Sequence, residues 1–274
     1  MLDVLQVLRS VFEHEIAVNG RYLPLGRPET VAQMASALPE LDRTKETTVT
    51  PMAPPNLFGE PEDPANDPSL SPYQRIEALI PEGSPLHSMT TLDEVEEYVR
   101  NTVLIPLDET RLNPVFGVGD PNADLMVIGE APGADEDRQG EPFVGRAGQL
   151  LNKILAAINF KREEVYIANI LKSRPPNNRE PLPDEVEAHR PILFKQIALI
   201  KPKILLCVGK TAGNSLLNRN SSLASMRNKV LDFYGLPVVV TYHPAALLRN
   251  PQWKRDTWKD VQLLRTHYDQ LTGK

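Results

Sequence analysis

The feature that most constrains the fold is an alternation of short apolar runs with helical patterns between residues 92 and 270. Runs of the strand type lie at 124–129, 165–169, 203–208 and 237–241. Segments with apolar residues at helical spacing lie at 92–99, 150–158, 183–200 and 253–268. Alternating strands and helices predict an α/β fold in which a mostly parallel sheet has helices on both faces.

The N-terminal part of the chain has a different character. Prolines crowd residues 40–73 and large apolar residues are few there, which predicts a proline-rich, acidic and disordered linker. Residues 1–39 hold two short stretches with helical spacing and are expected to form a helical segment. The folded α/β domain is therefore expected over residues 74–274.

Cysteine use and hydropathy narrow the class of protein. The single cysteine, Cys207, excludes internal disulfides and metal sites with several thiolate ligands. No apolar run is long enough to span a membrane, and the N-terminus lacks the basic leader and apolar block of a signal peptide. We therefore expect a cytoplasmic protein, without a membrane partner, that is a monomer.

The formal net charge of -6 runs against nucleic-acid binding, because phosphates are neutralised by Lys and Arg. Net charge is an average, however, and acidic residues gather in residues 57–97. Binding to DNA would require a local basic surface on the C-terminal part of the chain.

Small and polar residues follow three of the expected strands. Gly129 and Glu130 end the first, Asn169 ends the second, and His243 follows the last. Because ligands bind beyond the carboxyl ends of parallel strands, we expect these residues at one edge of the sheet.

Each strand end admits a functional and an ordinary interpretation. Phe143, in the glycine-rich loop after Glu130, can stack on a planar ligand or belong to the core. Asn169 can read the edge of a nucleobase or cap a turn. His243 can stabilise developing negative charge or be a buried histidine bonded to backbone. Similarly, the Leu-Leu-Arg run at 247–249 can open base stacks or pack inside.

Taken together in their order, these blocks resemble the family 4 uracil-DNA glycosylases, the iron–sulfur type. The match covers about residues 92 to 270, and its blocks read GEAPG at 129–133, PFVG at 142–145, YIAN at 166–169, RPP at 174–176 and YHPA at 242–245. The resemblance implies a three-layer α/β/α fold and hydrolysis of the N-glycosidic bond of deoxyuridine in DNA.

The resemblance also implies roles for individual residues. Glu130 and His243 would be catalytic, with Asp137 and Glu136 as further candidates for holding the attacking water. The uracil-binding residues would be Gly129, Ala131, Phe143 and Asn169. The DNA-binding residues would be Arg146, Lys172, Arg174, Arg179, Leu247, Leu248 and Arg249.

The chain departs from this family at its metal cofactor. The family normally holds a [4Fe–4S] cluster on four cysteines. Thr102, Ile105, Ser173 and His189 stand at the matching positions. We therefore expect no iron–sulfur cluster, no other metal, and local packing in its place.

The leading interpretation is an active base-excision enzyme whose partner is uracil-containing DNA. One alternative is a catalytically weakened uracil- or DNA-binding accessory protein. Another is a glycosylase for a different deaminated or damaged base. The intact Glu130, Phe143, Asn169 and His243 favour activity.

Overall fold

The computed structural model describes residues 64–273. The helical segment expected over 1–39 and most of the linker expected over 40–73 lie outside these residues. The remaining part of that linker holds the 3-10 turn η1 (Pro64–Asn66) and the start of α2 (Pro72–Glu77). Ala65 is fully buried, so the packed part of the chain begins before the expected boundary at residue 74.

Within the described residues, a six-stranded sheet has the order β1-β3-β2-β4-β6-β5. Its inner strands are parallel, whereas β1 and β5 pair antiparallel at the two edges. The strands are β1 (Val118–Gly119), β2 (Leu125–Gly129), β3 (Tyr166–Asn169), β4 (Ile204–Val208), β5 (Val230–Phe233) and β6 (Leu236–Thr241). The expected mostly parallel sheet is confirmed, and the two edge strands are additions that the sequence pattern does not predict.

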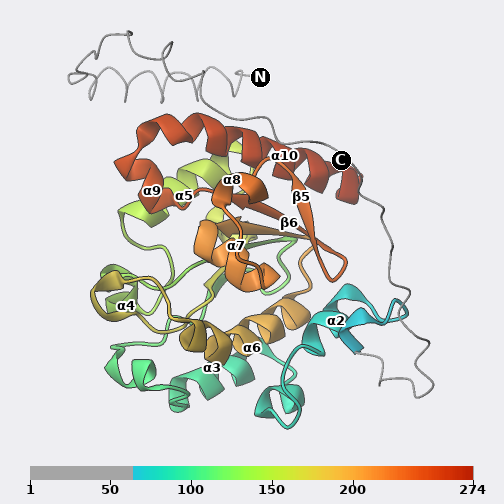
Figure 1. Cartoon of the computed structure of the whole chain (residues 1–274), viewed down its shortest axis with the longest axis vertical. Coiled ribbons are helices and arrows are strands. Elements are labelled where there is room, and N and C mark those ends of the chain that lie inside the picture. The colour runs from blue at the N-terminus through green and yellow to red at the C-terminus, as the bar shows by residue number, and fades with distance from the viewer. Residues whose placement is uncertain (1–63, 274) are drawn as a thin grey trace, which may run out of the picture. The chain divides into compact units, whose positions relative to one another are not determined.

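Helices cover both faces of this sheet. Figure 1 shows α5 and α10 together on one side and α3 and α6 on the other. The helices after α2 are α3 (Leu92–Asn101), α4 (Ala134–Gln139), α5 (Arg146–Ala157), α6 (Pro183–Ile200), α7 (Lys210–Leu217), α8 (Leu223–Met226), α9 (Pro244–Arg249) and α10 (Lys254–Thr272). The 3-10 turns after η1 are η2 (Pro85–Ser88), η3 (Pro106–Thr110), η4 (Arg162–Glu164), η5 (Pro176–Asn178) and η6 (Pro251–Trp253). Among residues 64–273, none of the helices is long and apolar enough to cross a membrane.

The strand β2 shows why its sequence is apolar without interruption. Leu125 and Val127 join a core cluster with residues of α5 and α10. Met126 and Ile128 join the cluster on the opposite face, with residues of α3 and α6. Successive side chains of a strand point to opposite faces, so a strand covered on both faces needs apolar residues throughout. This layered packing confirms the three-layer α/β/α fold.

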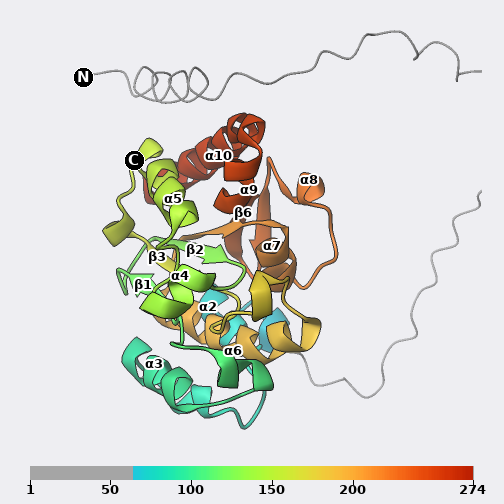
Figure 2. The same ribbon diagram turned by 90° about the vertical axis from the view of Figure 1, so that its left-hand side faces the viewer.

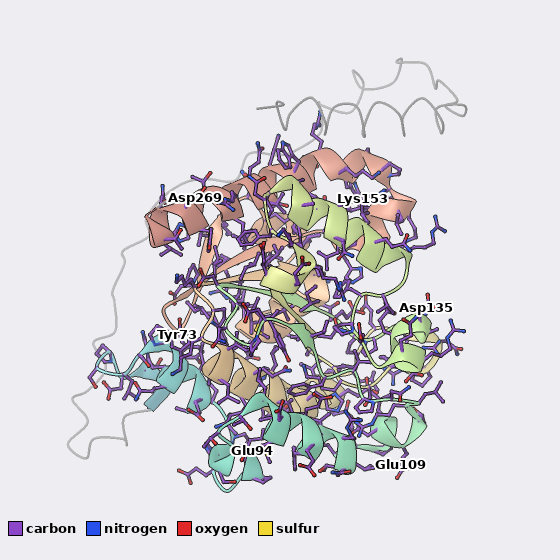
Figure 3. The ribbon with its side chains drawn as sticks, turned by 180° about the vertical axis from the view of Figure 1, so that it is seen from behind. Tyr73, Glu94, Glu109, Asp135, Lys153 and Asp269 are labelled. Atoms are coloured by element: carbon purple, nitrogen blue, oxygen red, sulfur yellow. The ribbon has the colours of Figure 1, made fainter. Side chains whose placement is uncertain are left out.

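Helix starts follow signals that are visible in the sequence. At α3 the hydroxyl of Thr91 accepts the Glu94 N–H (3.3 Å), and the Glu94 carboxylate accepts the Thr91 N–H (3.0 Å). This reciprocal pair is a capping box, and Glu94 marks that helix end in Figure 3. Pro183 occupies the first turn of α6, followed by Asp184 and Glu185, as expected.

Candidate active site

The carboxyl ends of β2, β3 and β6 lie around one pocket of about 430 Å³. Glu130 follows β2, Asn169 ends β3 and His243 follows β6, and all three side chains line it together with Phe143. The helices α4 and α9 border the same pocket and are visible together in Figure 2. The structure therefore brings together four residues that stand far apart in the sequence.

Gly129 lets two pocket residues approach closely. A Cβ atom at this position would lie 2.2 Å from Asn169 Oδ1 and 2.7 Å from Phe143 Cε2. Such distances are shorter than van der Waals contact, so the site accepts only a glycine here. Gly129 acts behind the pocket wall, where its lack of a side chain makes room for Asn169 and Phe143.

Phe143 is held in a backbone conformation that is rare for an aromatic residue. Its φ of 55° is left-handed, and its side chain is only 6% exposed. A Cβ atom at Gly148, in the first turn of α5, would lie 1.7 Å from the Phe143 carbonyl oxygen. The backbone of Phe143 is therefore pressed against α5, and this contact sets the direction of the ring.

Glu136, on α4, ties together the loop that carries Phe143. Its carboxylate accepts backbone N–H groups from Gly133 (3.1 Å), Val144 (3.0 Å) and Gly145 (3.2 Å). Glu136 also lines the pocket. Its oxygens are committed to shaping the loop, which fits a supporting role better than that of a proton acceptor.

Asp137 points away from the pocket, and the expectation that it holds the attacking water is wrong on geometric grounds. Its side chain is buried and its Oδ1 accepts the Leu112 N–H (2.9 Å). This bond joins α4 to the segment after η3; in Figure 3 Asp135 marks α4 and Glu109 marks η3. A helix turns by about 100° per residue, so Glu136 and Asp137 face different sides.

The side-chain oxygen of Asn169 is an unpaired group in the pocket wall. Asn169 is 2% exposed, and its Oδ1 is buried without a hydrogen-bond partner among residues 64–273. Buried polar atoms are almost always hydrogen-bonded, so each exception calls for a physical reason. A ligand N–H group beside the Phe143 ring would supply the missing donor.

His243 is held as a neutral hydrogen-bond donor. Its Nδ1 accepts the Ala245 N–H (3.2 Å), so the ring proton resides on Nε2. Burial, together with the positive charge of Arg249, lowers the pKa of His243 to about 4, against an opposing effect of Glu136. The ring centroids of His243 and Phe143 lie 5.6 Å apart.

Glu130 is the carboxylate whose surroundings favour its protonated form. Burial raises the pKa of Glu130; a hydrogen bond from Thr211 lowers it, and the negative charge of Glu180 raises it again. A carboxylate with a raised pKa is a better proton acceptor at neutral pH. Sequence reasoning missed both Thr211, on α7, and Glu180, which also lines the pocket.

Comparison with known proteins shows the family of the chain. The model of the uracil DNA glycosylase superfamily matches residues 116–263, more than half of the chain. The chain belongs to this superfamily. It is 40% identical over 182 residues to the type-4 uracil-DNA glycosylase of Archaeoglobus fulgidus, an alignment that covers 64% of this chain and 92% of the relative.

Two further relatives give the same result. The type-4 enzyme of Pyrobaculum aerophilum is 39% identical over 180 residues, which is 63% of this chain and 92% of that protein. The type-4 enzyme of Thermotoga maritima is 40% identical over 161 residues, 58% of this chain and 84% of that protein. These matches confirm the resemblance to the family 4 uracil-DNA glycosylases that the sequence blocks indicate.

Several residues line the pocket beyond those given a role from the sequence. They come mostly from the two loops that follow β2 and β3, and from α9. They are Pro132, Gly133, Ala147, Pro175, Asn178, Glu180 and Ala245, next to the expected Ala131, Arg179 and Arg249. Both loops are rich in proline, glycine and asparagine, a signal that could have marked them as pocket walls.

Among the expected DNA-binding residues of this glycosylase fold, the role assigned to Lys172 is wrong. Its side chain is fully buried, and its ammonium donates to the carbonyls of Phe116 (3.1 Å) and Asn169 (2.8 Å) and to Gln196 Oε1 (2.6 Å). Burial lowers the pKa of Lys172 to about 7. A lysine enclosed in this way cannot contact DNA, but it does hold the backbone of Asn169.

The two leucines of the Leu-Leu-Arg run at 247–249 differ in exposure because α9 turns them to different sides. Leu247 is 1% exposed and belongs to the interior, whereas Leu248 is 39% exposed. Leu247 is therefore not available for insertion into DNA, and Leu248 is. Arg249 and Arg179 line the pocket, Arg146 is exposed at the start of α5, and Arg174 donates to Asn178 (2.7 Å).

The residues at the expected cluster positions do not fit an iron–sulfur cluster, which is held by thiolates. The Thr102 carbonyl accepts a bond from Arg111, Ile105 donates its N–H to Asp108, and Ser173 and His189 both bind Asp108. Residues 64–273 contain no group of three or more His, Cys, Asp or Glu side chains that could hold a metal. Cys207 is buried in β4, and its burial raises the pKa of the thiol.

Proposed function

We propose that this protein is a uracil-DNA glycosylase that hydrolyses the N-glycosidic bond of deoxyuridine in DNA. The observation that carries the proposal is the unpaired Oδ1 of Asn169, which has no donor in the described part of the chain and belongs to a residue that lines the same pocket as Phe143. Uracil offers an N3–H donor between two carbonyl oxygens. An asparagine amide supplies the matching acceptor and donor.

The same atom supports discrimination against cytosine. Cytosine has an unprotonated N3, so Asn169 Oδ1 would face a second acceptor and stay unpaired. A site built to hydrogen-bond its substrate rejects an analogue that leaves buried groups unpaired by large factors. The Asn169 contact therefore favours uracil, the product of cytosine deamination, over cytosine.

The pocket can be reached only by a nucleotide that leaves the base stack. Phe143 would then stack on the flipped base, and Asn169 would bind its edge. As the C1′–N1 bond breaks, its electrons pass to the uracil ring, where the Nε2–H of neutral His243 donates to the growing negative charge. Water bonds to C1′ and releases its proton to Glu130, whose raised pKa suits this role.

Outside the pocket, the exposed cationic side chains are proposed to bind phosphates. Arg179 and Arg249 line the pocket and Arg146 is exposed at the start of α5, and affinity should fall as salt rises. Leu248 would enter the gap left by the flipped nucleotide. We propose that the protein acts on uracil-containing DNA as a monomer.

We also propose that the reaction runs without an iron–sulfur cluster. The support is the donor set at the cluster positions, a threonine, an isoleucine, a serine and a histidine engaged in other bonds. Iron and sulfide analysis of protein purified without oxygen should give less than one iron atom per chain. A stoichiometric cluster would refute this part of the proposal.

The test of the activity uses an oligonucleotide with a single uracil, followed by alkaline cleavage at abasic sites. Wild type should excise uracil, while Asn169→Ala and His243→Ala should each lose about 100- to 1000-fold in kcat/KM. Asn152→Ala is the matched control, because Asn152 lies on α5 and binds Arg162 rather than the pocket. A folded wild type that leaves uracil in place, on single and double strands, would refute the proposal; strands with hypoxanthine would then test another base.

A further inference from the structure

A buried carboxylate lies next to the loop that follows β3. Asp108, in η3, is 4% exposed, and both of its oxygens accept hydrogen bonds. Oδ1 accepts from the Ser173 hydroxyl and from His189 Nε2 (3.0 Å). Oδ2 accepts the backbone N–H groups of Leu104 (2.9 Å) and Ile105 (3.2 Å). This carboxylate is therefore fully engaged although it is out of contact with water.

Arg111 supplies the positive charge beside it. Its Nη1 lies 3.4 Å from Asp108 Oδ1 and donates to Ser173 Oγ (3.2 Å). Its Nη2 donates to the carbonyls of Val99 (2.6 Å) and Thr102 (3.0 Å). We call Asp108, Arg111, Ser173 and His189 the Asp108 cluster.

The surroundings keep this carboxylate ionised. Burial alone would raise the pKa of Asp108. Hydrogen bonds from His189, Ser173 and the Leu104 N–H more than offset that effect, and the pKa lies well below its usual range. The Asp108 cluster thus remains a charged, hydrogen-bonded unit throughout the neutral and mildly acidic range.

The Asp108 cluster forms hydrogen bonds with the residues that directly follow Asn169 in the sequence. We call residues 170–174 the β3 loop. Within it, the Lys172 N–H donates to His189 Nδ1 (3.0 Å), and the Ser173 hydroxyl donates to Asp108. The Lys172 ammonium reaches back to the Asn169 carbonyl (2.8 Å). Consecutive residues of the β3 loop are therefore fixed from α6 and from η3, and Asn169 is fixed with them.

We propose that the Asp108 cluster fixes the β3 loop in this chain in place of the iron–sulfur cluster, and that its members are positioning residues for Asn169. Ser173 and His189 occupy two of the expected cluster positions, and the backbones of Thr102 and Ile105 bind Arg111 and Asp108. The same segments are thus joined by a carboxylate and a guanidinium. The role assigned to Asn169 rests on the proposed function, whereas the hydrogen bonds that fix the β3 loop do not depend on it.

The test separates positioning from general stability. In the full-length protein, Asp108→Asn turns one acceptor into a donor that faces other donors, and Ser173→Ala removes one bond. His189→Gln keeps a donor for Asp108 and is the conservative variant. Lys195→Met is the matched control, because Lys195 is also buried on α6 and pairs with Glu77, away from the β3 loop.

Amide hydrogen exchange of peptides covering residues 169–174 is the first measurement. Asp108→Asn and Ser173→Ala should accelerate exchange there at least 10-fold, His189→Gln less, and Lys195→Met should leave it unchanged even where its Tm falls. Unchanged exchange in Asp108→Asn, or equal acceleration in Lys195→Met, would overturn the proposal.

Uracil excision well below each Tm is the second measurement. A misplaced Asn169 should lower kcat/KM about 10- to 100-fold in Asp108→Asn and Ser173→Ala, with His189→Gln close to wild type. Loss of the same size in Lys195→Met would reduce the Asp108 cluster to a stabilising element. Exchange is measured without DNA, so an inactive wild type would sink the proposed function alone.

Discussion

Asn169 and Asp108 are both buried polar residues beside the β3 loop, but their hydrogen-bonding states are opposite. Asn169 Oδ1 lacks a partner within residues 64–273, while both oxygens of Asp108 accept bonds. Likewise, His243 in the pocket offers a free Nε2–H, whereas His189 in the Asp108 cluster uses both ring nitrogens. The two regions are joined by only a few residues of chain.

This difference indicates that Asn169 is suited to binding a substrate, whereas Asp108 is suited to stabilising the fold. An unpaired buried polar group costs about 1 to 3 kcal/mol of stability, and a ligand that pairs with it recovers that cost. A fully bonded buried carboxylate offers nothing to a ligand, and its role is to keep neighbours in place. In this proposal the pocket residues bind the substrate, and the Asp108 cluster maintains the geometry that makes the binding selective.

The largest expected difference concerns stability. Asp108→Ala should lower the free energy of unfolding by about 3 to 5 kcal/mol, because Arg111 and His189 lose a buried partner. Asn169→Ala should change it by less than about 1 kcal/mol, since it deletes an unpaired oxygen. Urea denaturation measures both. Equal losses in the two variants would break the comparison.

Next in size is the close packing behind the pocket. Gly129→Ala adds a Cβ atom 2.2 Å from Asn169 Oδ1, so Asn169 and Phe143 must move apart. A displacement of this kind should reduce uracil excision about 100-fold. Gly83→Ala serves as a control with free space around the new atom, although the backbone of Gly83, unlike that of Gly129, is left-handed. Retained excision in Gly129→Ala would show that the pocket tolerates looser geometry.

A smaller effect is expected from the titration of His243. Its folded pKa of about 4 lies below the ordinary 6.5, so between these values the unfolded state binds more protons. As pH falls from 6.5 to 4, wild type should lose stability relative to His243→Gln, on the order of 2 kcal/mol. Denaturation midpoints at several pH values measure this loss. Parallel pH profiles of the two proteins would mean that His243 is not held neutral.

The smallest expected effect extends the comparison to apolar side chains on α9. Leu248→Ala should lower excision from double-stranded DNA about 10-fold and leave single-stranded excision and stability nearly unchanged, because Leu248 is exposed. Leu247→Ala should instead destabilise the fold by about 2 to 5 kcal/mol. The ratio of the two excision rates is the measurement. A Leu248→Ala ratio equal to that of wild type would remove Leu248 from the DNA contacts.

Much of the fold could be predicted because the inner strands are apolar along most of their length. Strands β2, β4 and β6 are covered on both faces, and such runs stand out in a sequence. The edge strands β1 and β5 could not be predicted in the same way. One spans only Val118–Gly119, and the other is half exposed, so neither leaves a clear pattern.

The site was predictable where topology alone decides position. Glu130, Asn169 and His243 follow strands whose ends meet in any such sheet. Lys172 was misassigned because its burial depends on Phe116 and Gln196, which approach it only in the folded protein. The missing cysteines pointed to an altered cluster site, but nothing in the local sequence marks Asp108 as the residue at its centre.

The left-handed backbone of Phe143 has a consequence for changing the specificity of this enzyme. Its ring direction depends on the contact of its carbonyl with Gly148, and its ring also closes over Gly129. Random substitution of position 143 alone would therefore be limited by the close contacts with these two glycines, whatever base the new side chain could bind. Libraries aimed at other bases should leave these three positions fixed and diversify the lining residues that follow β3, at Pro175, Asn178 and Glu180.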